Sequence, residues 1–202
     1  MKSQKSTRTL DDGGGGIRPA LAGSALFVLL CGLVYPTVAT LLGGLLFAQQ
    51  AGGSLIERDG RVVGSSLVAQ PFADARYFQP RPSAASFDPK ALSGSNLAGS
   101  NPALRERMAA DSAALATKLG VPASSLPADL ITASGSGIDP HVSPAGAQVQ
   151  VARVAQARGL PVDDVTALVH SHTARRTFGV LGEPRVNVLE LNLALDARSA
   201  RQ

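Results

Sequence analysis

The sequence predicts one transmembrane helix near the N-terminus, followed by a single compact α+β domain. Residues 19–51 contain no charged side chain, in a chain of 202 residues. The remainder mixes short β-prone runs around an Asp-Gly turn with helix starts at Asn101-Pro102 and Ser143-Pro144. The expected organisation is a cytoplasmic tail over residues 1–17, a membrane helix over 18–48 and an extracytoplasmic domain over 49–202.

Composition excludes some classes of protein. The net charge is +4, but the lysines and arginines are scattered and no aromatic residues alternate with them, so we expect no nucleic-acid partner. The only cysteine, Cys31, lies inside the apolar run. The domain therefore holds neither a disulfide nor a thiolate metal site.

The apolar run is long enough to span a membrane. A span needs about 20 apolar residues, and residues 21–47 meet that length. A secretory signal peptide is the main alternative, but its apolar region is shorter and ends at a small-x-small cleavage site, which Ala48-Gln49-Gln50-Ala51 matches poorly. Pro36 lacks a backbone N–H, so we expect it to kink the helix.

Basic residues predict the orientation of the helix. Four of them precede it, and the first one after it is Arg58. Because the positive flank stays in the cytoplasm, the domain is expected on the outer, extracytoplasmic side of the membrane. The four are Lys2, Lys5, Arg8 and Arg18.

Residues 19–51 carry no Asp, Glu, Lys, Arg or His, which argues that this chain alone moves no ion. Ala39, Gly43 and Gly44 are small residues at a spacing that lets another helix approach closely. Glycine and alanine are also common in any membrane helix, so their spacing alone leaves both interpretations open.

Local signals predict the elements of the domain. Asp59-Gly60 joins two β-prone runs and predicts a hairpin. Asn101-Pro102 predicts a helix start, and Gly120 predicts its end. The remaining predictions are a buried strand over 129–133, a flexible turn over 134–137 leading into a helix from Ser143-Pro144 to Gly159, and a helix over 163–172. Residues 187–195 fit either a strand or a helix, and a helix is favoured.

Two prolines give residues 76–83 an extended path. Tyr77 and Phe78, in this segment, are among the few aromatic residues outside the span. They are expected to anchor the core, with a partner-binding patch as the alternative.

Candidate reactive residues are few. Asp139, His141, His170 and His172 are the only set to test as metal ligands, but His170 and His172 do not share a helical face, so we expect no metal site. Ser136 lies between two glycines without the G-x-S-x-G pattern of a hydrolase elbow. A membrane-anchored extracytoplasmic hydrolase using Ser136 or the histidines is the alternative function, although no catalytic residue is predicted.

Several motifs occur in one order along the chain: GSLIERDGRVVGSSLVAQPF, YFQPRPSA, SGSNLAGSNPAL, DLITASGSGIDPHVSPAGA, RVAQARGL and GEPRVNVLELNLAL. Together with the single N-terminal span they resemble the C subunit of the bacterial Kdp-type potassium-transporting P-type ATPase. The resemblance runs from Arg18 to about Asp196.

The resemblance implies an accessory, non-catalytic subunit that supports assembly and activity of the complex. Its partners would be a potassium-selecting channel-like subunit, a P-type ATP-hydrolysing subunit and a small single-span subunit, all within membrane lipid. The resemblance also implies that the complex lies in the bacterial inner membrane, with this domain in the periplasm. ATP and potassium would be handled by the complex, with no cofactor bound firmly by this chain.

In that family the C subunit is also described as a catalytic chaperone that raises the ATP affinity of the hydrolysing subunit, through a Ser-Gly-Gly-containing loop. The matching positions here are Ser93, Gly94, Ser95 and Asn96, where only one glycine is present. The expected orientation places this loop outside the cytoplasm, away from ATP.

Overall fold

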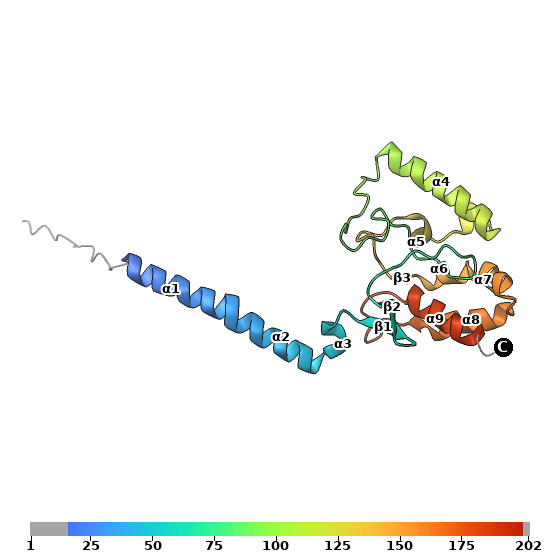
Figure 1. The fold of residues 1–202 in the computed structure, drawn as a ribbon. Coiled ribbons are helices and arrows are strands. Elements are labelled where there is room, and N and C mark those ends of the chain that lie inside the picture. Colours follow the sequence, from blue (N-terminus) through green and yellow to red (C-terminus); the bar gives the residue numbers. More distant parts are fainter. Residues whose placement is uncertain (1–15, 200–202) are drawn as a thin grey trace, which may run out of the picture. The chain divides into compact units, whose positions relative to one another are not determined.

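The computed structural model describes residues 16–199, which form two compact units that meet at Gly52 and Gly53. Figure 1 shows the first unit as a long helix and the second as a mixed domain of helices and short strands, which confirms the predicted α+β class. The basic residues Lys2, Lys5 and Arg8, used to predict the orientation, lie outside the described residues.

The first unit is a nearly continuous helix. Among the described residues, Ile17–Leu46 is the one helix long and apolar enough to cross a membrane, with 30 residues. The predicted disturbance near Pro36 takes the form of a π-helical segment, in which the Tyr35 N–H bonds the Leu30 carbonyl. The elements are α1 (Ile17–Leu29), the π-helix η1 (Leu30–Val34), α2 (Tyr35–Leu46) and the short α3 (Ala48–Ala51).

The domain begins with the predicted hairpin. Strand β1 (Leu55–Arg58) pairs antiparallel with β2 (Arg61–Ser65), and a bulge lies between Ile56 and Glu57. Both turn residues have positive φ, 52° at Asp59 and 73° at Gly60, as a two-residue hairpin turn requires.

A second sheet has three short antiparallel strands in the order β3-β5-β4. The strands are β3 (His141–Val142), β4 (Thr173–Ala174) and β5 (Arg185–Asn187). Val186 of the central strand is fully buried.

Figure 1 shows α6 to α9 close together around this sheet, whereas α4 lies along one edge of the domain. The helical elements are α4 (Pro102–Leu119), the 3-10 turn η2 (Ala123–Ser125), α5 (Ala128–Ile131), α6 (Pro144–Gln148), α7 (Val151–Arg158), α8 (Val162–Ser171) and α9 (Val188–Ser199). The predicted ends of α4 are confirmed, since the Asn101 side chain accepts from the Ala103 N–H and Gly120 is left-handed.

The core is built from α7, α8, α9 and the central strand. Its largest fully buried apolar side chains are Phe78, Val151, Val154, Val165, Val169, Val186, Val188, Leu191 and Leu195. Phe78 is therefore a core anchor, as expected from the sequence.

The strand predicted over residues 129–133 is wrong: the chain forms the one-turn helix α5 there. Pro127 precedes the helix in an extended conformation, Asp129 lies in its first turn, and Leu130 is its one buried residue. The Asp129 carboxylate accepts hydrogen bonds from the Ser143 N–H at 2.7 Å and the Ser143 hydroxyl at 3.1 Å. A distant partner thus favours the turn over the strand.

The helix predicted from Ser143-Pro144 to Gly159 is two helices, α6 and α7, with a break at Val149-Gln150. In a continuous helix the Gln150 N–H would bond the Gly146 carbonyl. Instead it bonds the Ala147 carbonyl, and the Gln150 side-chain amide donates to Gly146 at 3.0 Å. The turn over 134–137 leads first into β3 rather than directly into α6, and Ser134 within it is buried.

Candidate functional site

The proline-rich segment, residues 71–83, crosses the domain as an irregular chain whose backbone is held by buried side-chain amides. Asn192 of α9 accepts from the Phe78 N–H at 2.8 Å and donates to the Phe78 carbonyl at 3.0 Å. Gln150 does the same for Gln79, at 2.8 and 3.1 Å. Each side-chain amide thus supplies the two backbone hydrogen bonds that a neighbouring strand would otherwise make. Both side chains are at least 98% buried.

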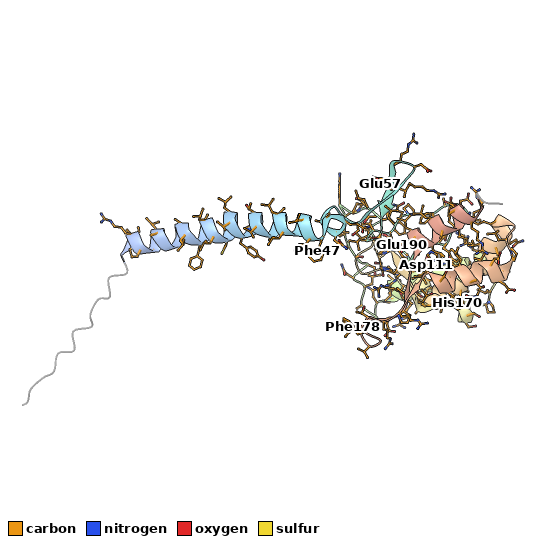
Figure 2. All side chains as sticks on the ribbon, turned by 90° about the horizontal axis from the view of Figure 1, so that it is seen from below. Phe47, Glu57, Asp111, His170, Phe178 and Glu190 are labelled. Carbon is orange, nitrogen blue, oxygen red and sulfur yellow. The ribbon has the colours of Figure 1, made fainter. Side chains whose placement is uncertain are left out.

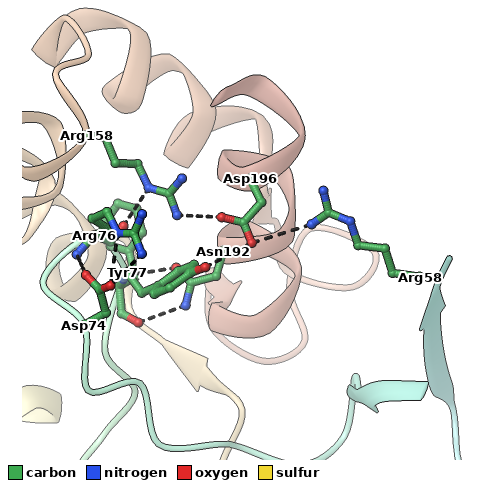
Figure 3. Close-up of polar contacts among 8 residues, drawn as sticks. Arg58, Asp74, Arg76, Tyr77, Arg158, Asn192 and Asp196 are labelled. Carbon is green, nitrogen blue, oxygen red and sulfur yellow. Dashed lines mark hydrogen bonds and ion pairs between the residues drawn. The ribbon is translucent and has the colours of Figure 1, made fainter. Parts of the chain in front are cut away.

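Two arginines hold the first half of the segment. Arg153 donates to the carbonyls of Ala75 and Tyr77, and Arg158 donates to the Arg76 carbonyl. In Figure 3, Arg158 also reaches Asp196 of α9, with a distance of 2.8 Å between nitrogen and oxygen.

Asp196 is the centre of this cluster (Figure 3). It accepts from the Tyr77 hydroxyl at 3.2 Å and forms an ion pair with Arg58 of β1 at 3.5 Å. The Arg158 guanidinium lies 4.8 Å from the centroid of the Tyr77 ring, which is a cation–π distance. The hairpin, the proline-rich segment, α7 and α9 therefore meet at one carboxylate.

The other side of the segment faces α4 across an open groove of about 410 Å³, which we call the α4 groove. Lys118 of α4 crosses it to donate to the Gln79 side chain at 3.0 Å. Partial burial lowers the pKa of Lys118 from its ordinary value, and the nearby Arg153 charge adds to that effect. The groove is lined by Pro71, Phe72, Gln79, Pro80, Arg81, Pro82, Ser83, Phe87, Asp111, Ala114, Leu115, Lys118, Leu130 and Gln150.

Arg81 ties the end of the segment to the loop before β3. Its guanidinium lies 3.1 Å from the Asp139 carboxylate, which also accepts from the His141 N–H at 3.0 Å. Burial would raise the pKa of Asp139, but hydrogen bonds from His141 and Arg81 outweigh it, so this pKa is lowered. Asp139 is therefore a charged structural carboxylate.

The two Ser/Gly loops noted in the sequence, residues 92–96 and 134–137, pack together through their backbones. A side chain added at Gly94 would meet the Gly135 carbonyl oxygen at 2.9 Å, and one at Gly137 would meet the Ser93 carbonyl oxygen at 2.8 Å. Close backbone approach is a reason for glycine at both places.

Ser83 also joins these loops, because its hydroxyl donates to the Gly137 carbonyl at 2.6 Å and accepts from the Phe87 N–H at 2.9 Å. Of the family-proposed loop, Ser93 and Asn96 are exposed, whereas Gly94 and Ser95 are half-buried. The Ser93 hydroxyl donates to the Gly94 carbonyl at 2.9 Å.

The other reactive candidates do not converge. Asp139 and His141 are neighbours, with 3.5 Å between Nδ1 and Oδ1, but no group of three possible metal ligands occurs among the described residues. The Ser136 hydroxyl lies 3.2 Å from that of Ser134 and accepts from the Ile138 N–H. His172 bonds the Leu168 carbonyl within its own helix.

Ala39, Gly43 and Gly44 lie on α2. An added side chain at Gly43 or Gly44 would meet no atom of the described chain within 4 Å. These positions are open to a neighbouring helix.

Sequence reasoning missed Gln150, Asn192 and Arg153, which hold the proline-rich segment. Asn192 could have been suspected, because it follows Leu191 on the apolar face of a predicted helix, where a buried amide needs a partner. Nothing in the sequence indicates that the partner is the backbone of Phe78.

Comparison with known proteins identifies the family of the chain. The family model described as K+-transporting ATPase, c chain, matches residues 17–197, which include both the apolar helix and the domain. The chain belongs to the KdpC family. The resemblance inferred from the motifs is thereby confirmed.

Individual KdpC relatives agree. The chain is 60% identical over 181 residues to the Potassium-transporting ATPase KdpC subunit of Xanthomonas oryzae pv. oryzae, covering 88% of this chain and 87% of the relative. It is 54% identical over 187 residues to the subunit of the same name from Gemmatimonas aurantiaca, covering 91% and 94%. The corresponding subunit of Shewanella putrefaciens is 52% identical over 181 residues, covering 90% and 89%.

The family makes this chain a subunit of a potassium-transporting ATPase with several subunits. The buried amides, the ion-pair cluster and the packed Ser/Gly loops all fall within the matched residues. These features therefore belong to the KdpC part of the chain.

Proposed function

We propose that this chain is a non-catalytic subunit that stabilises the assembled potassium pump from outside the cytoplasm, while a P-type partner subunit hydrolyses ATP. The observation that carries the proposal is the family match, which runs through the apolar helix and the domain together. Residues 19–46 of this helix carry no charged side chain and offer an ion no path of their own, so the contribution of the helix is packing against partners.

The proposed partners are the potassium-selecting channel-like subunit, the ATP-hydrolysing subunit and a small single-span subunit. Within the membrane, the face carrying Ala39, Gly43 and Gly44 is the proposed contact. Gly43→Leu would separate the helices, and the matched control is Leu45→Ile, at an exposed apolar position of the same helix. We expect Gly43→Leu to reduce recovery of the larger subunits with this chain in detergent, and the control to leave it unchanged.

The assembly role is tested by deleting the chain. We expect the remaining subunits to lose potassium-stimulated ATPase activity and to separate on size-exclusion chromatography. Recovery of this chain only as a lone monomer, with ATPase activity unaffected by its deletion, contradicts the proposal.

The effect on ATP affinity described for the family would then be indirect, transmitted through the membrane helices. Whether the effect is direct or indirect depends on which side of the membrane the domain occupies. We propose Ser93→Cys and Ser3→Cys, each in a Cys31→Ala background, reacted with a membrane-impermeant maleimide on intact spheroplasts. Ser93→Cys should react at once, and Ser3→Cys only after permeabilisation.

The opposite labelling pattern would place the domain in the cytoplasm. If ATP then protected Ser93→Cys in permeabilised cells, direct nucleotide binding at residues 93–96 would replace the indirect effect. The apparent KM for ATP of the complex, measured with Ser93→Ala at an exposed position of the loop, gives a second readout. A value changed without loss of assembly would argue for a nucleotide loop.

A further inference from the structure

The loop between β4 and β5, residues 175–184, carries the most exposed large apolar side chains of the domain. We call it the Phe178 loop. Phe178 is 89% exposed, Val180 72% and Leu181 59%. In Figure 2, Phe178 points away from the body of the domain.

The loop is nonetheless an ordered turn. Thr177 and Leu181 exchange backbone hydrogen bonds of 2.8 and 2.9 Å, and the Val180 N–H bonds the Thr177 carbonyl at 3.2 Å. Phe178 and Gly179 form the tip, with φ of 54° and 78°. The backbone therefore holds the apolar side chains outward.

A phenylalanine at position 178 does not stabilise the domain. A turn with two successive positive φ values favours asparagine, aspartate or glycine, and a bulky residue there is strained. Exposure in water adds a second cost for the same side chain. Backbone strain of this kind is found where a residue serves an outside contact.

The flanks of the tip are basic. Residues 175–185 contain three arginines against one glutamate. Glu183 is paired with Arg176, whose nitrogen lies 2.7 and 2.9 Å from its two oxygens. Arg175 and Arg185 are exposed, and neither forms an ion pair with another described residue. An apolar tip flanked by exposed positive charges is suited to a lipid bilayer, whose interior is apolar and whose headgroups can be anionic.

The domain cannot move far from such a surface. The apolar helix ends at Leu46, and Ser54 is the first buried residue of the domain. The few residues between them reach at most ~25 Å when fully extended.

The base of the Phe178 loop is hydrogen-bonded, through Ser66, to the start of the domain at Ser54. The Asn187 amide of β5 donates to the Ser66 carbonyl at 2.8 Å, and the Ser66 N–H bonds the Ser54 carbonyl at 3.0 Å. Two further exposed apolar side chains, Leu55 and Leu67, directly follow Ser54 and Ser66 in the chain.

We propose that the Phe178 loop docks on the lipid bilayer that holds the helix. Phe178, Val180 and Leu181 enter the boundary between headgroups and acyl chains. Arg175 and Arg185 lie against the phosphates of anionic phospholipids. The loop is then a second, reversible attachment that limits how the domain turns on its short tether.

The test uses the full chain, with Cys31→Ala, reconstituted alone into vesicles of phosphatidylcholine and phosphatidylglycerol. Phe178→Cys carries a bimane label, and lipids with a nitroxide on the upper acyl chain act as quencher. The matched control is Val162→Cys, which replaces an apolar residue, 52% exposed, at the start of α8. We expect blue-shifted emission and several-fold stronger quenching at Phe178→Cys than at Val162→Cys.

Val180→Cys repeats the measurement without altering the turn residue. Equal weak quenching at both loop positions and at the control would overturn the proposal. So would a label that becomes protected only when the other subunits are added, because the loop would then bind protein.

The contribution of Arg175 and Arg185 is tested separately. We expect Arg175→Ala combined with Arg185→Ala to lower the quenching in anionic vesicles to the level seen in pure phosphatidylcholine. Quenching that is the same in both lipids for the parent chain would contradict the role of the arginines.

Discussion

Phe78 and Phe178 occur in similar sequence contexts, but one side chain is buried and the other is exposed. Each lies two positions after an arginine in an irregular segment. Phe78 is fully buried, and its backbone is bound by Asn192, whereas Phe178 is 89% exposed on a turn that bonds only to itself. The difference is made by distant polar partners, which let the proline-rich segment be buried without losing hydrogen bonds.

The strongest test of this comparison truncates both rings. Phe78→Ala should lower the free energy of unfolding by about 3–5 kcal/mol, because it leaves a cavity in the core. Phe178→Ala should change it by no more than about 0.5 kcal/mol, as at other exposed sites. Urea unfolding of the full chain in detergent, followed by circular dichroism, measures both. Equal losses for the two variants would refute the contrast.

Asn192→Leu asks whether the amide, rather than the ring, holds the segment. The change keeps the volume but leaves the buried N–H and carbonyl of Phe78 without partners. We expect a loss of about 2–6 kcal/mol, from about 1–3 kcal/mol for each of the two unsatisfied groups. Hydrogen exchange at the Phe78 amide should also accelerate.

Asn101→Ala is the control for Asn192→Leu, since it removes an exposed helix cap and should cost about 1 kcal/mol. If Asn192→Leu cost no more than this control, the buried hydrogen bonds would not account for the position of the segment.

The Arg81–Asp139 contact should make the end of the proline-rich segment sensitive to acid. Because the folded-state pKa of Asp139 is lowered, its stabilisation is complete above the ordinary carboxyl pKa and disappears as the pH falls through the folded value. Asp139→Asn should cost about 1–2 kcal/mol at pH 7. It should also flatten the decline in stability below about pH 4. Parallel pH curves for the variant and the parent would contradict this.

The smallest effect is expected in the Phe178 loop. Glu183→Gln removes an exposed ion pair with Arg176, so the free energy of unfolding should change by less than about 0.5 kcal/mol. The same urea titration measures it. A loss above 1 kcal/mol would mean that the loop contributes to domain stability as the proline-rich segment does.

The elements that sequence reasoning predicted correctly have local causes. Asp59-Gly60 determines a turn by its own backbone preferences, and Asn101 and Gly120 define the ends of α4 in the same way. Phe78 was expected in the core because large aromatic residues are scarce in this domain.

The errors have distant causes. Residues 129–133 look like a strand, but Asp129 is bound by Ser143, which no local pattern reveals. The helix from Ser143-Pro144 looks continuous, yet Gln150 interrupts it, because its side-chain amide donates to the Gly146 carbonyl of α6 and to the Gln79 carbonyl.

The site was harder to predict than the fold for the same reason. The Ser/Gly loops were noted singly, but only the folded chain shows that Gly94 lies against Gly135. The Phe178 loop was not singled out, because nothing in its sequence distinguishes an exposed phenylalanine from a buried one.

The π-helical segment Leu30–Val34 has a geometric consequence for partners in the membrane. One extra residue in a turn rotates every later side chain by about 100° around the axis, relative to an unbroken α-helix. Side chains of α2 therefore lie at other angles around the axis, relative to those of α1, than they would in an unbroken α-helix. A straight partner helix that packs along one side of α1 thus meets a different set of α2 side chains than the sequence spacing suggests. Deleting a single residue in this segment should restore the α-helical phase between α1 and α2.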